Sequence, residues 1–185
     1  MKIEWKSGNF VYPVPAVLVS CGSNEHANLI TVAWTGTLNT NPAMAYISIK
    51  PERYSYNIIK ETGEFVINLT NEDLCYATDW CGVKSGAKVD KFKELHLHKE
   101  NAKYVKCPLL KESPVSIECK VKEIIPLGSH HMFVGEVLCI DADNKYINEK
   151  GAFDINKCNL ISYANGNYYK LGKKIGKFGY SVRKK

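Results

Sequence analysis

Several motifs that often identify an enzyme class are missing from this chain. It has no G-x-G-x-x-G segment and no succession of strand, helix and strand, which disfavours a Rossmann nucleotide-binding domain. It also has no G-x-S-x-G segment, no cysteine–histidine constellation and no paired carboxylates suited to hydrolysis. The sequence therefore offers no recognisable nucleophile or acid–base pair for a hydrolase.

Long apolar runs are missing as well, since no stretch approaches the roughly 18 residues that a membrane-spanning helix requires. The net charge is +6, but residues Lys170–Lys185 hold seven of the 25 basic residues and no acidic residue. The remaining chain has 18 basic and 19 acidic residues, a net charge of −1. A basic groove for nucleic acid is therefore not expected. The basic C-terminal tail is either solvated or lies near an anionic cofactor or nucleotide.

A disulfide framework is not indicated either. The chain has seven cysteines, an odd number, without a C-x-x-C pair. Three of them (Cys21, Cys119 and Cys139) lie in apolar, strand-like runs that predict buried thiols, and this usage favours the reducing cytoplasm. The stretch Leu18–Cys21 looks like a lipoprotein cleavage box. Because prolines and an acidic residue precede it, it does not suit an export leader, and we expect an unprocessed N-terminus.

Short strands dominate what is present. Apolar alternation and β-branched runs predict strands at Val14–Cys21, Asn28–Trp34, Ala43–Ile49, Glu64–Leu69, Ser113–Ile125, His131–Ile140 and Leu160–Ala164. Residues 35–42 are expected to be a loop. Short helices are predicted from Arg53 to the Thr62-Gly63 stop, at Asn71–Trp80 and around Asp90–Phe92. The pattern predicts one mainly β domain, with six or seven antiparallel strands closed into a barrel and a few short helices at its mouth.

The strand at Ser113–Ile125 alternates strictly, which makes its two faces easy to assign. Val115, Ile117 and Cys119 are expected on the buried face, whereas Glu118 is expected on the other face with Lys120 and Lys122.

Candidate binding residues gather where the first predicted strands end. Thr31 and Trp34 lie near the exit of the strand that begins at Asn28. Lys50, Arg53 and Ser55 gather at a predicted helix N-terminus, where unpaired N–H groups and the helix dipole favour an anion. A guanidinium group adds a two-pronged grip on phosphate. An aromatic, hydroxyl-bearing strand end beside an anion site suggests a flat, phosphorylated cofactor.

Six segments carry a family resemblance: TVAWTG (31–36), KPERYSYNII (50–59), GEFVIN (63–68), CGVKSGAKVDKF (81–92), LGSHHMFVGEV (127–137) and YYKLGKKIGKFGYS (168–181). In this order they resemble the flavin reductase-like, FMN-binding split-barrel family, close to the flavoredoxins. The resemblance implies an antiparallel Greek-key split barrel over residues 1–185, with residues 168–185 as a basic tail. It also implies FMN as cofactor, NADH or NADPH as reductant, and a homodimer with the flavin near its interface.

The same resemblance implies further site residues. Lys91 would approach the pyrimidine side of the flavin, although an ion pair with Asp90 or Glu94 is an alternative. Of the neighbouring histidines, His130 is expected to reach the flavin, because His131 begins the next strand. Asn28 could offer its amide to the ring edge, and Tyr163 could pack on the ring from the C-terminal side. Since a flavin performs its own chemistry, no catalytic side chain is expected.

Some alternatives remain open at this point. A flavin reductase and an FMN electron carrier, with or without a redox protein as acceptor, need the same side chains. There are two rival readings: a flavin-binding module without nicotinamide activity, and a nucleic-acid-binding barrel. The net charge of −1 outside residues 170–185 argues against the second. His96 and His98 could share a strand face and bind a metal, but without further ligands nearby we expect solvated histidines and no metal site.

Overall fold

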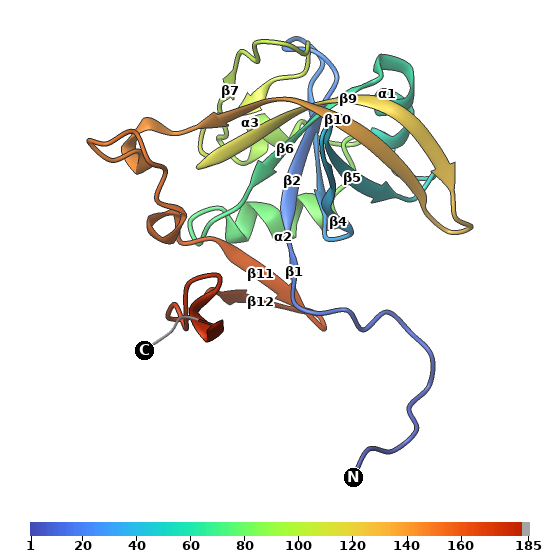
Figure 1. The fold of residues 1–185 in the computed structure, drawn as a ribbon. Helices are drawn as coiled ribbons and strands as arrows, with labels where there is room; N and C mark the ends of the chain where they lie inside the picture. The colour runs from blue at the N-terminus through green and yellow to red at the C-terminus, as the bar shows by residue number, and fades with distance from the viewer. Residues whose placement is uncertain (183–185) are drawn as a thin grey trace.

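The computed structural model describes residues 1–182 and consists mainly of one curved antiparallel sheet (Figure 1). Seven strands lie in the order β3-β2-β6-β9-β10-β5-β4. A hydrogen bond from Ser48 N to Trp34 O (2.9 Å) links the exit of β3 to β5, so that the two ends of the sheet approach each other. The split-barrel fold predicted from the sequence is confirmed. The strands are β2 (Val17–Cys21), β3 (Asn28–Val32), β4 (Thr35–Thr40), β5 (Ala43–Ile49), β6 (Glu64–Leu69), β9 (Val115–Pro126) and β10 (His131–Ala142).

Residues 35–42 were expected to be a loop, and this prediction is wrong. Thr35 and Gly36 pair with Ile47 and Tyr46, and the pairing continues past a bulge to Thr40. The strand escapes sequence analysis because β4 is an edge strand whose outer half is exposed. It therefore lacks the apolar alternation by which half-buried strands are recognised.

Three α-helices flank the sheet: α1 (Tyr54–Thr62), α2 (Cys75–Val83) and α3 (Lys91–Glu94). The predicted ends of α1 are confirmed, because Arg53 is its extended N-cap and Gly63 ends it in the left-handed conformation (φ 68°). The predicted start of α2 at Asn71 is wrong. Asn71 instead forms a β-bridge with Leu160, and its side chain accepts a hydrogen bond from Leu74 N (3.1 Å), so the helix begins after that turn.

Two small sheets extend the fold: β1 (Val14–Pro15), β11 (Ile161–Ala164) and β12 (Asn167–Lys170) form one, and β7 (Lys99–Glu100) and β8 (Leu109–Leu110) form the other. The predicted strand Val14–Cys21 is thus divided at Ala16 between two sheets. Short 3-10 helices lie at Asn144–Tyr146, Ile155–Cys158 and Tyr180–Val182.

The expected basic tail, residues 168–185, begins inside β12, where Lys170 pairs with Glu72 (2.5 Å). Residues 171–182 follow at the surface, and residues 183–185 lie outside the described part of the chain. No helix within residues 1–182 has the length and apolar character needed to cross a membrane.

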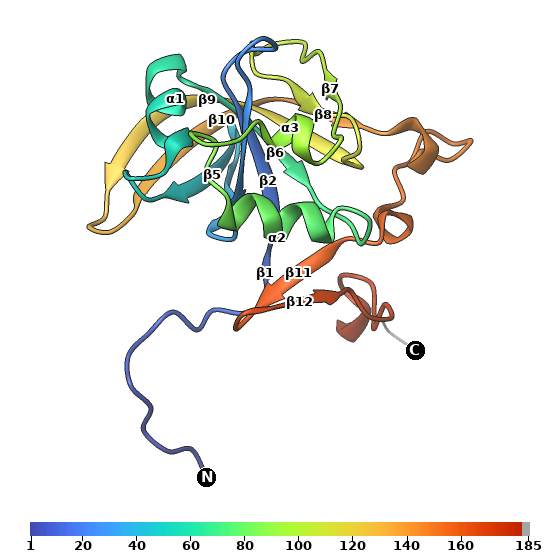
Figure 2. The same ribbon diagram turned by 180° about the vertical axis from the view of Figure 1, so that it is seen from behind.

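The hydrophobic core lies on both faces of β2 and β3. Inside the barrel, Phe65 and Phe133 are fully buried, and a side chain at Gly135 would overlap the ring of Phe65. On the opposite face, Leu18 and Leu29 pack against α2 and α3, which lie across these strands (Figure 2). Burial on both faces explains the nearly continuous apolar sequence of β2.

Glu118 was expected at the surface with its neighbouring lysines, and this prediction is wrong. Its side chain is fully buried, because residues 101–107 cover that face of β9. Its carboxylate accepts hydrogen bonds from three consecutive backbone N–H groups: Lys103 at 2.8 Å, Tyr104 at 2.6 Å and Val105 at 3.0 Å. This irregular segment has no strand partner at these positions, so Glu118 supplies the acceptors that a sheet would otherwise provide.

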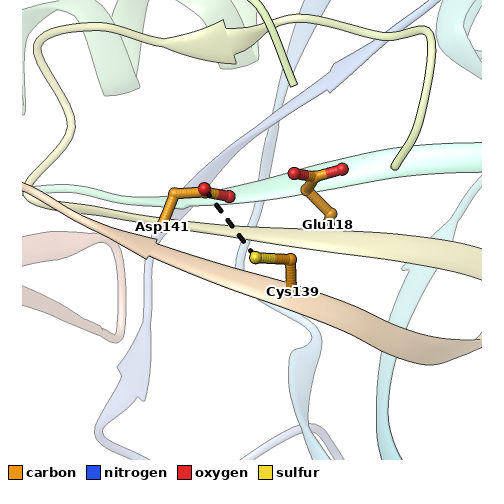
Figure 3. Close-up of side chains that lie close together, drawn as sticks. All are labelled: Glu118, Cys139 and Asp141. Atoms are coloured by element: carbon orange, nitrogen blue, oxygen red, sulfur yellow. Dashed lines mark hydrogen bonds between the residues drawn. The ribbon is translucent and has the colours of Figure 1, made fainter. Parts of the chain in front are cut away.

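A second carboxyl group, that of Asp141 on β10, faces Glu118 (Figure 3). Within residues 1–182, Asp141 Oδ2 is the one buried side-chain oxygen or nitrogen without a hydrogen-bond partner, while Oδ1 accepts from Cys139 Sγ at 3.8 Å. Burial raises the pKa of Asp141, and the Glu118 charge raises it further. A proton on Asp141 gives the orphaned oxygen a partner. Cys139 itself is only partly buried, unlike Cys21 and Cys119, which corrects its predicted burial.

We expect Glu118→Gln to destabilise the fold by on the order of 3 kcal/mol. The amide keeps the shape of the side chain but turns one acceptor into a donor that faces N–H groups, which leaves buried groups unpaired. Urea unfolding would measure the change, and amide exchange at residues 103–105 should accelerate before that of β9. A loss of less than about 0.5 kcal/mol would show that these three hydrogen bonds contribute little.

The raised pKa of Asp141 predicts an unusual pH dependence. Because the folded chain holds this proton to higher pH than the unfolded chain does, the contribution of Asp141 to stability falls as pH rises above about 4 and through its folded pKa. Asp141→Asn keeps an N–H donor toward Glu118 at every pH and should remove this fall, as followed by thermal unfolding between acid and neutral pH.

Asp143 provides the matched contrast, because a hydrogen bond from Lys145 lowers its pKa. Asp143→Asn should remove stability at neutral pH, where the native carboxylate is ionised, and little at acid pH. If the stability of the wild type and that of Asp141→Asn depend on pH in the same way, Asp141 does not hold a proton against Glu118 in the folded chain.

Candidate functional site

Two adjoining cavities open where β3 and β5 end and α1 begins. The inner cavity has a volume of about 270 Å³, and the outer cavity about 140 Å³. Ile30, Thr31 and Arg53 line both, so the two form one continuous site. Eight of the nine predicted binding residues line it: Asn28, Ser55 and Lys91 in the inner cavity, Trp34, Lys50 and His130 in the outer one, and Thr31 and Arg53 in both.

Tyr163 is the exception. It lies on β11, where its ring packs against Tyr168 (5.5 Å between centroids) and Tyr12 (6.2 Å). Tyr12 in turn lies 6.4 Å from Trp34, so Tyr163 is separated from the cavity by one ring. It is absent from the lining of both cavities. Pairing of β11 with β1 rather than with the main sheet explains this displacement.

Asn28 and Ser55 are joined by a buried hydrogen bond from Asn28 Nδ2 to Ser55 Oγ (2.7 Å). The hydroxyl oxygen thus already accepts one hydrogen bond from the protein, and Ser55 can offer a ligand its hydroxyl proton and its backbone N–H in the first helical turn. The Asn28 amide, expected at a flavin edge, connects β3 to α1.

The hydroxyl proton of Thr31 is already used within the protein, because the hydroxyl donates a hydrogen bond to the backbone carbonyl of Thr78 on α2. The oxygen retains acceptor capacity on its cavity side. Thr31 therefore fixes α2 against β3 and can accept a hydrogen bond from a ligand but has no proton left to donate.

Lys91 is a buried cation. Its side chain is 3% exposed, and Nζ donates to the backbone carbonyl of Cys81 at 2.7 Å. Among residues 1–182, no ion pair involves Lys91, and Asp90 instead caps α3 by accepting from Lys93 N (3.1 Å). The alternative of an ion pair with Asp90 or Glu94 is thus not what the structure has. Burial lowers the pKa of Lys91, the nearby thiols of Cys81 and Cys21 oppose this, and Arg53 adds to the lowering.

Three further basic side chains line the cavities: Arg53 lines both, and Lys50 and His130 line the outer one. Arg53 is exposed at the N-cap of α1. Lys50 pairs loosely with Glu52 (3.8 Å). His130 is half-buried, and burial followed by the Lys50 charge lowers its pKa, so that it is neutral at pH 7. The neighbouring His131 is turned away, since its Nδ1 lies 2.7 Å from the hydroxyl of Tyr56. The site is therefore electropositive overall.

The thiols in this region are not nucleophiles. Burial raises the pKa of Cys21 to about 12 and that of Cys81 to about 11. Both remain protonated at neutral pH even though Lys91 favours the thiolate. Thiol–disulfide chemistry at the cavity is therefore disfavoured, and the site is suited to binding an anionic ligand.

Sequence reasoning missed one wall of the inner cavity, which comes from the loop between α2 and α3 and includes Lys84, Ser85 and Gly86. A signal was present, because these residues belong to the CGVKSGAKVDKF segment that carried the resemblance. Only the packing of α2 on β3 brings this loop beside Asn28.

Comparison with known proteins identifies the family. A profile of the flavin reductase like domain matches residues 8–172, which is most of the chain. The chain belongs to the flavin reductase-like family. Membership places it among flavin-related oxidoreductases and electron carriers.

Its relatives support the same assignment. An uncharacterised protein of Archaeoglobus fulgidus is 33% identical over 147 residues, which cover 80% of this chain and 81% of that protein. The flavoredoxin of Desulfovibrio vulgaris (Miyazaki F) superimposes with a TM-score of 0.91 at 28% identity, covering 99% of this chain and 100% of the other. The flavoredoxin of Methanosarcina acetivorans gives a TM-score of 0.89 at 28% identity, with the same coverage.

Proposed function

We propose that this protein binds FMN in the two adjoining cavities and acts as an FMN-dependent oxidoreductase that accepts electrons from NADH or NADPH. The observation that carries the proposal is the buried Lys91 ammonium, which has no anionic partner within the described residues 1–182 and lies beside Arg53 and the start of α1. A buried cation is costly unless an opposite charge accompanies it. A bound phosphorylated flavin would provide that charge.

The residues present fit such a cofactor. Arg53 and the unpaired N–H groups of the first turn of α1 suit the phosphate, and Ser55 could donate to it from its backbone N–H and its hydroxyl. Trp34 offers an aromatic wall at the outer cavity, and Lys91 and Arg53 offer positive charge. FMN would supply the electron-transfer chemistry, while the chain binds and orients it and adjusts its reduction potential.

The proposal also covers the location, assembly and electron acceptor of the protein. We expect a homodimer in the cytoplasm that prefers FMN to FAD. A redox protein is one candidate electron acceptor. The N-terminal arm supports self-association, because it extends away from the body and exposes Ile3, Trp5 and Phe10, each by more than 70% (Figure 1). Apolar side chains exposed in this way favour burial against a second chain.

The main alternative is an electron carrier without nicotinamide activity, which the likeness to two flavoredoxins favours. Anaerobic mixing of the FMN-loaded protein with NADH or NADPH separates the two. We expect the flavin absorbance to bleach with one or both nucleotides. Bound FMN that bleaches with dithionite but with neither nucleotide would establish the carrier, and a protein that binds no flavin would refute both.

Two substitutions should separate cofactor affinity from reduction potential. Arg53→Ala removes a charge-assisted contact to phosphate and should weaken FMN binding by about 2 kcal/mol, or roughly thirtyfold. Lys91→Ala removes a cation near the reduced, anionic flavin and should lower the midpoint potential by some tens of millivolts, since about 1–3 kcal/mol is at stake and 30 mV corresponds to ~1.4 kcal/mol.

His130→Ala is the matched control for Lys91→Ala, because the lowered pKa of His130 leaves it uncharged at neutral pH. Its midpoint potential should stay near that of the wild type at pH 7. Redox titration with reference dyes would measure all three potentials. A Lys91→Ala potential within a few millivolts of the wild type would exclude the lysine from this role.

A further inference from the structure

Of the two glycines that line the candidate site, Gly82 and Gly86, Gly86 makes the closer approach to a neighbouring residue. A side chain at this position would overlap Asn28 Oδ1 and place its Cβ 2.6 Å from Asn28 Cγ and 2.9 Å from Nδ2. All three atoms belong to the amide group, so the amide of Asn28 lies against the bare backbone of the loop between α2 and α3. Glycine is required here by the close approach rather than by an unusual backbone angle.

Asn28 cannot easily move to make room. Its backbone is fixed by the pairing of β3 with β2, opposite Cys21, and its side chain is 6% exposed. The amide could only rotate about its own bonds, which would break the hydrogen bond to Ser55 Oγ (2.7 Å). Ser55 is 1% exposed, so its hydroxyl would find no water as a replacement partner.

The contact lies between two walls of the inner cavity. Lys84 and Ser85 belong to the loop wall, which ends at Lys91, the first residue of α3. Arg53 and Ser55 belong to the wall at α1, and Asn28 touches both walls. The thickness of the Asn28 amide therefore determines how far apart these walls stand. One added methyl group at position 86 would push the loop wall outward or would displace the amide and, with it, Ser55.

We propose that Gly86 is a positioning residue for the cofactor: its lack of a side chain sets the width of the inner cavity, and so the separation of Lys91 from Arg53, through Asn28 and Ser55. This inference rests on the proposed binding of FMN in that cavity. It concerns a residue that contacts Asn28 rather than the reacting atoms.

A double-mutant cycle tests the inference by its non-additivity. FMN dissociation constants would be measured by quenching of flavin fluorescence for the wild type, Gly86→Ala, Asn28→Ala and the double variant. Each single variant should bind FMN roughly tenfold more weakly, the factor expected for one lost buried hydrogen bond. The double variant should be no weaker than Asn28→Ala, because the methyl group then occupies the space left by the amide.

The control is Gly172→Ala, since no atom lies within 4 Å of a Cβ at that position. It should bind FMN like the wild type, which would exclude a general effect of replacing glycine. If Gly86→Ala does not fold, recovery of folding in the double variant would show that the overlap with the Asn28 amide is the cause, and a double variant that binds FMN more weakly than Asn28→Ala would overturn the inference.

The possible outcomes are distinct. A wild-type chain that binds no FMN refutes the proposed function. If the wild type binds FMN, two results would overturn the positioning role alone. One is that Gly86→Ala binds FMN as tightly as the wild type; the other is that the double variant binds it roughly a hundredfold more weakly than the wild type. A purely structural role would lower the unfolding temperature of Gly86→Ala without cofactor and leave the FMN affinity of its folded fraction unchanged.

Discussion

The candidate site depends on the burial of β3 on both faces. Ile30 and Val32 point into the barrel core, while Leu29 packs under α2 and α3. The Thr31 hydroxyl fastens α2 to the same strand. Because the strand cannot shift without exposing one of these cores, it holds its position relative to the elements around the cavities: the start of α1, the loop that contains Gly86, and Lys91 at the start of α3.

Among residues 1–182, the charged side chains that are buried are those of Glu118 and Lys91, and their surroundings differ. The Glu118 carboxylate accepts three backbone N–H groups within the chain, so its charge is balanced by the fold itself. Lys91 has three donors, one carbonyl partner and another cation, Arg53, nearby. An anion bound from outside the chain would therefore stabilise Lys91 but not Glu118, since a desolvated charge without a partner is unfavourable. This contrast supports a structural role for Glu118 and the proposed binding role for Lys91.

The hydrogen bonds around Ser55 show how the fold assigns roles within one cluster. A serine at a helix start is a natural phosphate contact, and here its hydroxyl oxygen also accepts a hydrogen bond from Asn28. The residue still places the first turn of α1, whose N–H groups remain available. Asn28 and Gly86 therefore affect the cavity through packing, whereas Arg53 and Lys91 affect it through charge.

The sequence by itself determined those features that depend on local patterns. Apolar alternation located most strands, and the Thr62-Gly63 pair ended α1 correctly. Basic and hydroxyl residues near Arg53 predicted an anion site at a place where the structure has a cavity. Local patterns failed where long-range contacts override them. Glu118 alternates like a surface residue but is covered by a segment that needs its acceptors, and the polar strand β4 pairs only because β5 is beside it.

Only the tertiary structure decided which distant residues meet. Asn28, Ser55, Gly86 and Lys91 are separated in sequence, and no periodicity relates the loop after α2 to the first residue of β3. Their meeting follows from α2 packing across β3, a choice made by the complementary shapes of two apolar surfaces rather than by any local preference. The sequence determined which chemical groups were available, and the packing of α2 on β3 determined their arrangement.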